Sequence, residues 1–527
     1  MSKPRDDRQK DLLLPALDQI IDMGHALVRL AALIDWKFLD DRFGSVCQTG
    51  PGQPGLPTRL VAGLFILKHM HNLSDEVLCA RWIENPYYQY FCGELSFCHR
   101  LPFDRSSMTR WRQRLGEDQL VALIQESLSV AHNTGAIGPK DLERVVVDTT
   151  VQPKAVAHPT DARLMHRALT KLVGFAQRNN VPLRQSYLRV AKRAAIMVGR
   201  YTHAHQFKRA RRQLKFLRTR LGRIIRDIRR KIDGDAALEA RFGPLLDLAQ
   251  RVRTQDQHQR GPKVYALHAP EVECIGKGKA RAPYEFGCKV SIATPVTSPK
   301  GGQFVLHAKA LHGNPFDGHT LGPVVADMEK LTGVEARRIH VDKGYRGHNH
   351  PHRLRVWISG QVRCVTASIR REMKRRAVVE PVIGHVKAEH RMDRNYLKGR
   401  AGDRINAVLA AAGYNFGLLL RWLADLLRAI IRDFAGSKYR LNQPSSAFFT
   451  ADQLKNKTDA TNEMPGMPSR RGDPAITNNG HAAPLVSPQS PPGPRRSWHP
   501  CSRRRRCTPR RAGARQWACA APAGSSG

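Results

Sequence analysis

The sequence predicts a mixed α/β protein that begins with an all-helical region. Two apolar runs predict strands: Val145–Val147 is β-branched throughout, and Ile339 and Val341 alternate with a polar residue. Residues 159–262 carry apolar side chains at helical intervals, which predicts a helical insertion between the first and second core strands. The length allows several such units. We expect a helical N-terminal domain at 1–138, an α/β domain at 139–434 that contains the insertion, and a tail at 435–527.

An acidic residue follows each of the two runs, and a third acid opens a helix. Asp148 ends the strand of the first run in this prediction, and Asp342 ends the strand formed by Ile339–Val341. Glu380 stands directly before Pro381, which suits the first turn of a helix because a missing N–H costs little there. Taken singly, the aspartates can cap turns and the glutamate can complement the helix dipole. Taken together, the three can direct carboxylates into one pocket.

Three carboxylates suit a hard divalent cation. Magnesium prefers oxygen ligands and is usually held by one or two carboxylates together with phosphate oxygens. A pair of such ions can activate an attacking water or hydroxyl and stabilise the leaving oxygen of a phosphodiester. We therefore expect two Mg²⁺ ions, with Mn²⁺ able to substitute. The candidate phosphate or DNA contacts near the site are Arg376, which can grip phosphate bidentately, and Lys387, Lys343 and Arg346.

The order of these motifs resembles a known family. The chain carries DTT from Asp148, VDKGYRGH around Asp342, and R-x3-E-x6-K formed by Arg376, Glu380 and Lys387. This is similar to the DDE transposases of bacterial insertion sequences, in particular the insertion sequence five family, over residues 15 to 434. The resemblance implies an RNase H-like catalytic core whose catalytic, metal-binding triad is Asp148, Asp342 and Glu380. One position departs from the fuller signature, because Met373 stands where related enzymes have a tyrosine.

The activity that this resemblance implies is DNA transposition. Such an enzyme, as a homo-oligomer in a synaptic complex, binds the terminal inverted repeats of its element, cuts the strand and joins the freed 3′ hydroxyl to target DNA. Two other classes stay open. An RNase H-like nuclease would use the same triad without strand transfer, and a non-catalytic DNA-binding remnant of a decayed element would keep the charge and lose the acids.

The charge of the chain independently indicates nucleic acid as a partner. Lys and Arg number 87 against 45 Asp and Glu, for a formal net charge of +42. Between residues 162 and 231 there are 21 Lys and Arg and a single acid, Asp227. Apolar residues such as Leu217, Leu221 and Ile225 recur among these arginines, which predicts amphipathic helices with a basic outer face. We expect this face to track the DNA backbone, although a merely solvated face is the alternative.

The N-terminal region is the candidate for sequence recognition. Residues 58–71 and 74–83 are predicted to be helices, and a further helix begins near Ser106. Its first turns resemble the recognition helix of a helix-turn-helix domain, with Thr109, Arg110 and Arg112 as the candidate DNA contacts. An ordinary core helix is the alternative, and the two roles can belong to opposite faces.

The remaining features concern location. The N-terminus shows no signal-peptide pattern, and charged residues in the most apolar stretch, Ala407–Ile431, favour a buried or interface helix over a membrane span. The ten cysteines show no C-x2-C pair, which argues against a zinc site and favours reduced thiols. We therefore expect a cytoplasmic, nucleoid-associated protein that contacts no membrane. The tail is rich in Pro, Ser, Gly and Arg, which predicts disorder, whether as read-through sequence or as a basic DNA-binding arm.

Overall fold

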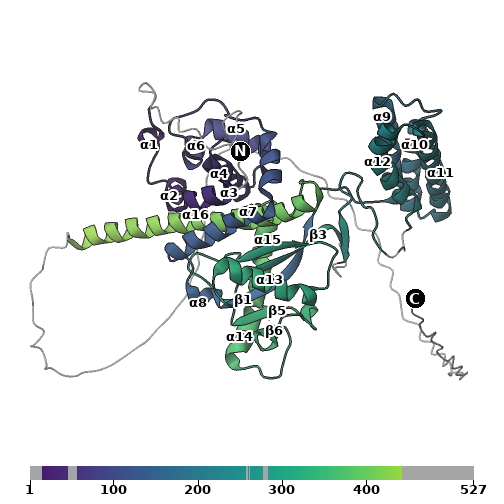
Figure 1. The fold of residues 1–527 in the computed structure, drawn as a ribbon. Coiled ribbons are helices and arrows are strands. Elements are labelled where there is room, and N and C mark those ends of the chain that lie inside the picture. The colour runs from purple at the N-terminus through teal and green to yellow at the C-terminus, as the bar shows by residue number, and fades with distance from the viewer. Residues whose placement is uncertain (1–14, 45–55, 257–258, 260, 277–282, 442–527) are drawn as a thin grey trace, which may run out of the picture. The chain divides into compact units, whose positions relative to one another are not determined.

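The computed structural model describes residues 15–44, 56–256, 259, 261–276 and 283–441 (Figure 1). Helices alone precede the first strand in these ranges. They are α1 (Leu17–Ile20), α2 (Ala26–Leu33), α3 (Trp36–Gly44), α4 (Thr58–Met70), α5 (Asp75–Glu84), α6 (Pro86–Phe91), α7 (Ser107–Asn133) and α8 (Pro139–Leu142). Helix α4 is buried on nearly every side and forms the centre of this part. Helix α7 bends at Gly116, whose positive φ of 69° interrupts it.

A mixed six-stranded sheet follows, so the α/β composition predicted from the sequence is observed. Its strands are β1 (Arg144–Pro153), β2 (Glu273–Gly276), β3 (Tyr284–Pro295), β4 (His307–Leu311), β5 (Arg338–Val341) and β6 (Val356–Ile358). The order is β2-β3-β1-β5-β6, and β4 also pairs with β3. Strand β1 is antiparallel to β3 and parallel to β5. The central position of β1 places its residues between strands that are far apart in the sequence.

The first strand is longer than predicted. We expected it to end at Asp148, but β1 continues to Pro153. The reason is that β3 goes on pairing with it, from Asp148 opposite Ile292 to Pro153 opposite Gly287, and so continues to bond the backbone. Only the parallel pairing with β5 stops, at Val147 opposite Val341.

The helices α13 (Asp317–Thr332), α14 (Ala367–Arg375), α15 (Val379–Glu389) and α16 (Gly399–Leu441) complete this part of the protein. Helix α16 lies beside α7 and also contacts α4, α2 and β4 (Figure 1). Its approach to α4 requires a glycine, because a Cβ at Gly413 would lie 2.5 Å from Cβ of His69. The helix runs to Leu441 and therefore past the predicted start of the tail at 435. Residues 442–527, the remainder of that predicted tail, lie outside the described residues.

The apolar character of α16 comes from protein packing. Gly399–Leu426 is long and apolar enough to cross a membrane, but 72% of its most apolar window is buried inside the protein. Asn415, in the middle of this stretch, donates to Oγ of Ser127 and to the carbonyl of Val305, and accepts from the Val305 N–H. A buried amide with three partners fixes the helix against its neighbours. These contacts agree with the prediction of a buried helix.

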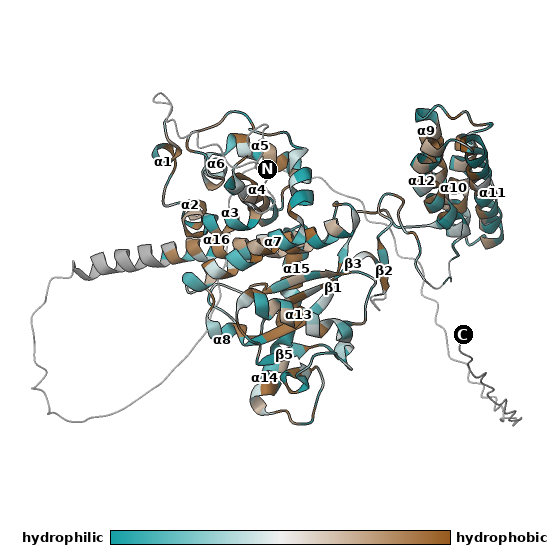
Figure 2. Ribbon diagram, viewed as in Figure 1, coloured by the Kyte–Doolittle hydropathy of each residue, from teal (hydrophilic) through white to brown (hydrophobic). Residues whose placement is uncertain are grey.

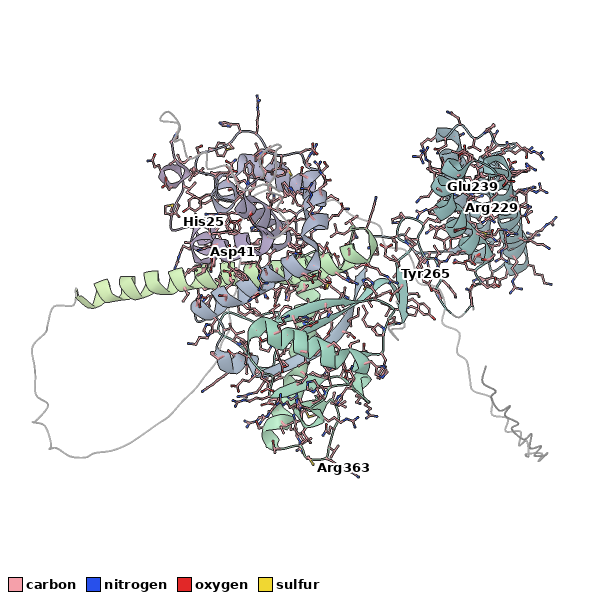
Figure 3. All side chains as sticks on the ribbon, viewed as in Figure 1. His25, Asp41, Arg229, Glu239, Tyr265 and Arg363 are labelled. Atoms are coloured by element: carbon pink, nitrogen blue, oxygen red, sulfur yellow. The ribbon has the colours of Figure 1, made fainter. Side chains whose placement is uncertain are left out.

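The predicted insertion consists of four helices between β1 and β2. They are α9 (Asp161–Arg178), α10 (Leu188–His203), α11 (Phe207–Ile232) and α12 (Ala236–Thr254). These helices have their own apolar core, which includes Leu169, Leu217, Ile225 and Phe242. Most of α11 is hydrophilic in Figure 2, and Figure 3 labels one of its exposed side chains, Arg229. The amphipathic pattern predicted for this segment is thus observed.

Candidate active site

The register of two parallel strands places the first two acids side by side. Val147 pairs with Val341, so the next residues, Asp148 on β1 and Asp342 after β5, come to the same level of the sheet. Residues in register on neighbouring parallel strands project from the same face. Beyond Asp342 the chain turns into a short 3₁₀ helix, Lys343–Tyr345. Its Tyr345 side chain is buried, which anchors the loop.

The side chain of Arg376 lies close to all three acids, including Glu380. Arg376 opens the 3₁₀ turn that leads into α15, and Glu380 lies four residues later in the first turn of that helix. Nη1 of Arg376 lies 3.7 Å from Oδ2 of Asp148, and Nη2 lies 3.8 Å from Oδ1 of Asp342 and 3.8 Å from Oε1 of Glu380. The structure therefore brings all three predicted acids around one cationic side chain.

The three carboxylates differ in their exposure. The side chain of Asp148 is 19% exposed, that of Asp342 50% and that of Glu380 65%. Burial raises the pKa of Asp148 to about 6, although the Thr149 N–H bond and the charge of Arg376 act against the rise. The site is thus deep at Asp148 and open to solvent at Glu380. A large substrate can reach it from the open side.

A fourth acid, Asp317, lies next to the site and was missed by the sequence analysis. It is the first residue of α13, and its Oδ1 accepts from Oγ1 of Thr149 at 3.1 Å and from Nζ of Lys289 at 3.0 Å. Its charge contributes to the raised pKa of Asp148, after burial and the nearer Asp342. No local pattern marks this residue, because an acid at a helix N-terminus is common for dipole reasons alone.

Glu372 on α14 anchors the segment that carries Arg376. One of its oxygens accepts from Arg338 at 2.8 Å and from Arg144 at 3.3 Å, and the other lies 3.1 Å from Nε2 of His340. These partners belong to β1, the strand that contains Asp148, and to β5, the strand that Asp342 follows. The carboxylate of Glu372 is 9% exposed, so its contacts are shielded from water. It therefore fixes α14 to the strands four residues before Arg376.

The other basic residues predicted to contact phosphate or DNA differ in their exposure. Lys343 and Arg346 are exposed on the loop after Asp342, and Lys387 is half-buried on α15. Met373, at the position where related enzymes have a tyrosine, is half-buried on α14.

The predicted DNA-reading residues of α7 divide into two groups. Thr109 and Arg110 are exposed in its first turns, so they can face a ligand. The prediction that Arg112 contacts DNA is wrong. Its side chain is buried and donates to both oxygens of Asp75, at 3.1 and 2.6 Å. Asp75 also accepts from the buried Lys68. The cationic group of Arg112 thus ties α7 to α5 and is not placed to contact DNA.

Comparisons with known proteins point to a transposase domain in the N-terminal part of this chain. Residues 15–114 match the family model described as "Transposase domain (DUF772)". A Rhizobium meliloti protein named "Uncharacterized protein ORF8 in nfe locus" is 51% identical over 199 residues, which cover 38% of this chain and 96% of that protein. No solved structure matches. The chain therefore carries a domain of a transposase family at residues 15–114, and it belongs to the same family as the Rhizobium meliloti protein, whose printed name gives no activity.

Proposed function

We propose that this transposase is a DDE enzyme, with an RNase H-like core, which binds the terminal inverted repeats of an insertion sequence and catalyses metal-dependent strand cleavage and strand transfer. The observation that carries the proposal is the convergence of Asp148, Asp342 and Glu380 on the guanidinium of Arg376. Segments separated by 194 and 38 residues meet at this point. A mixed sheet with the first acid on its central strand supports the proposed core.

The residues of this site fit a divalent metal ion. Their donor atoms are carboxylate oxygens, the ligands that Mg²⁺ and Mn²⁺ prefer. Three carboxyl groups face one guanidinium. The pKa of Asp148 remains raised, so the positive charge of Arg376 does not offset the cost of burying this carboxylate. Asp148, Asp342 and Glu380 would hold two ions. When bound, these ions would activate the attacking water or 3′ hydroxyl and stabilise the leaving oxygen of an in-line displacement.

The basic residues of the site would bind and orient the DNA. Arg376 can present two parallel donors to a phosphate group. Lys343 and Arg346 are exposed beside Asp342 and can hold neighbouring phosphates of the same strand. Glu372 would act indirectly, because it holds α14 on the strands and so keeps Arg376 in place. No residue of this set has to form a covalent bond to DNA.

Two surfaces outside the site would supply affinity and specificity. The exposed arginines of α11, among them Arg211, Arg212, Arg223 and Arg226, would contact the DNA backbone and give salt-dependent, sequence-independent affinity. Thr109 and Arg110 at the start of α7 would reach base edges of the terminal repeats. A homo-oligomer would hold two such ends together, and a cytoplasmic, nucleoid-associated location suits this substrate.

The test uses the purified protein and labelled duplexes carrying the DNA that flanks its reading frame. We expect Asp148→Asn, Asp342→Asn and Glu380→Gln each to abolish Mg²⁺-dependent nicking while binding the duplex as wild type does. Asp118→Asn, a change at an exposed position on α7, is the matched control and should cleave normally. Normal cleavage by the three site variants would refute the proposed triad.

A second assay separates the transposase from a simple nuclease. Duplexes that already end in the recessed 3′ hydroxyl are incubated with a supercoiled target plasmid. A transposase joins them to the plasmid, and a nuclease gives no joined product. Cleavage without joining would therefore favour the nuclease class.

A further inference from the structure

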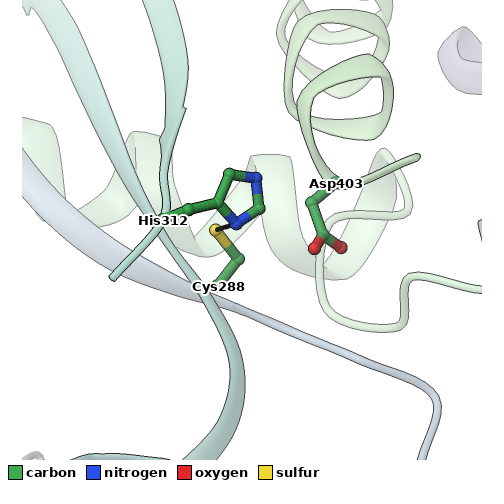
Figure 4. Close-up of side chains that lie close together, drawn as sticks. All are labelled: Cys288, His312 and Asp403. Atoms are coloured by element: carbon green, nitrogen blue, oxygen red, sulfur yellow. Dashed lines mark hydrogen bonds between the residues drawn. The ribbon is translucent and has the colours of Figure 1, made fainter. Parts of the chain in front are cut away.

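Three side chains that could bind a metal ion lie close together outside the candidate active site. Cys288 is on β3, His312 follows the last residue of β4, and Asp403 is in the first turns of α16. Their candidate ligand atoms all lie within 4.8 Å of one another. Figure 4 shows the thiol and the imidazole in contact, with the carboxylate of Asp403 facing them across a short gap. The cluster joins three elements that are far apart in the chain.

The distances in this cluster suit a tetrahedral ion. Sγ of Cys288 lies 3.4 Å from Nδ1 of His312. Bonds of about 2.3 Å to sulfur and about 2.0 Å to nitrogen, at the tetrahedral angle, separate two ligands by about 3.5 Å. The thiol and imidazole are therefore already spaced as two ligands of one ion. The most distant pair of the three, at up to 4.8 Å, would have to close by about 1 Å, which side-chain rotation can supply.

The surroundings hold the third ligand in place. Oδ1 of Asp403 accepts from Nζ of Lys154 and from Nδ2 of Asn395, both at 2.7 Å. Since both contacts end on Oδ1, Oδ2 can bind a cation while its carboxylate is fixed. Ligands held by such outer contacts are a regular feature of metal sites.

Glu273 on β2 lies near this cluster and is a candidate fourth ligand, although its oxygens are not among the ligand atoms that lie within 4.8 Å of one another. Oε1 of Glu273 accepts from the N–H of Gly313, next to His312, at 2.6 Å. Within the part of the chain that the structure describes, its other oxygen, Oε2, is buried without a hydrogen-bond partner. A buried carboxylate oxygen without a partner is costly unless a cation or a donor reaches it.

The charges of the cluster also favour a cation. Lys154 pairs with both Asp403 and Glu271, and the charge of Arg404 also acts on His312. Three carboxylates, counting Glu273, thus face one buried ammonium.

We propose that Cys288, His312 and Asp403, completed by Glu273, bind one Zn²⁺ ion that ties the start of α16 to the edge of the sheet. Sulfur, nitrogen and oxygen donors together select a borderline metal such as zinc and disfavour magnesium, which avoids thiolate. The site would stabilise the fold and stands apart from the chemistry at Asp148. It does not depend on the proposed function.

The test measures zinc directly in the full-length chain, purified without a histidine tag. Cys501, Cys507 and Cys519 are replaced by serine throughout, so that thiols of the C-terminal segment do not contribute. Metal-stripped protein is titrated with Zn²⁺ in excess Mg²⁺, which occupies the carboxylate site. We expect about one equivalent of bound zinc and a rise in the melting temperature. Co²⁺ in place of Zn²⁺ should give a thiolate-to-cobalt charge-transfer band.

Variants of single ligands decide whether the ion is at this site. Cys288→Ser and His312→Gln should each lose the equivalent of zinc, the charge-transfer band and the zinc-dependent rise in melting temperature. Cys98→Ser, which removes a half-buried thiol on a different part of the chain, should keep all three. If a variant does not fold, the cobalt spectrum of the parent protein still decides the question. Sub-stoichiometric zinc in the parent, a cobalt spectrum without the thiolate band, or full zinc binding by Cys288→Ser would each overturn the proposal.

Discussion

Replacing Asp148 by asparagine should make the protein inactive and more stable at once. The carboxylate lies in the deepest part of the site, where its side chain is only 19% exposed. Burial raises its pKa from 3.8 to about 6. Above pH 6 the folded protein must therefore hold a charge that would be better solvated in the unfolded chain. An asparagine of nearly the same shape removes that charge.

The raised pKa of Asp148 sets how much the substitution should stabilise the protein and how that gain should depend on pH. A group whose folded pKa lies above its unfolded value binds more protons in the folded state, so the free energy of unfolding falls as pH rises from about 4 to about 6. A shift of about two units corresponds to about 3 kcal/mol once both pKa values are passed. Because the amide also loses the attraction of Arg376, we expect Asp148→Asn to be about 1–3 kcal/mol more stable than wild type at pH 8. At pH 4 the two should be nearly equal.

The measurement is urea unfolding of both proteins without metal, at pH 4 and pH 8. Comparing the two proteins at each pH removes the contributions of other titrating groups, which the substitution leaves in place. Saturating Mg²⁺ should stabilise wild type at pH 8 and stabilise the asparagine variant much less, because one ligand is gone. A variant that is less stable than wild type at pH 8 would contradict the premise that burial of Asp148 is costly. Equal stabilisation of both proteins by Mg²⁺ would contradict its role as a ligand.

Four further predictions concern Arg376, its anchor Glu372 and two arginines of α7. Arg376→Ala should lower the rate of Mg²⁺-dependent nicking by about 100-fold, since it removes a phosphate donor, and should leave duplex binding within a few fold. Glu372→Gln should weaken the anchor of α14, lowering stability by about 2 kcal/mol in urea unfolding and reducing the nicking rate with unchanged DNA affinity. Arg112→Ala should cost about 3 kcal/mol by leaving Asp75 poorly paired. Arg110→Ala should change stability by less than about 0.5 kcal/mol and instead weaken binding to the terminal repeats in a gel-shift assay. Opposite behaviour of these last two variants would contradict the orientation of α7.

The features that could be predicted from the sequence are those that depend on short local patterns. The amphipathic spacing of α11 depends only on residues within a few turns, and its buried Leu217, Leu221 and Ile225 lie where that spacing puts them. The charges interrupting the apolar stretch of α16 likewise indicate a helix packed in protein, as observed. The three acids were found because each stands in a recognisable local motif.

Features set by tertiary contacts were not predictable in the same way. Asp148 lies within a strand because β3, more than 130 residues later, goes on pairing beyond it. Arg112 had the spacing of a DNA contact, but Asp75 of another helix holds it inside the domain. The cluster around Cys288 is assembled from single residues on separate elements, so a search for paired cysteines could not find it.

The contacts of Arg376 bear on how the three acids could take up a cation under the proposed function. A guanidinium locked to a carboxylate makes bonds of about 2.8 Å. Here the nearest distances are 3.7–3.8 Å, shared among three acids, so the group is bonded closely to none of them. Its charge limits the mutual repulsion of the carboxylates, and under the proposed function its loose hold would let a divalent cation take its place at little cost. The segment that carries Arg376 is held by α14, which Glu372 fixes to the strands, so the guanidinium would remain available to a phosphate beside the same acids.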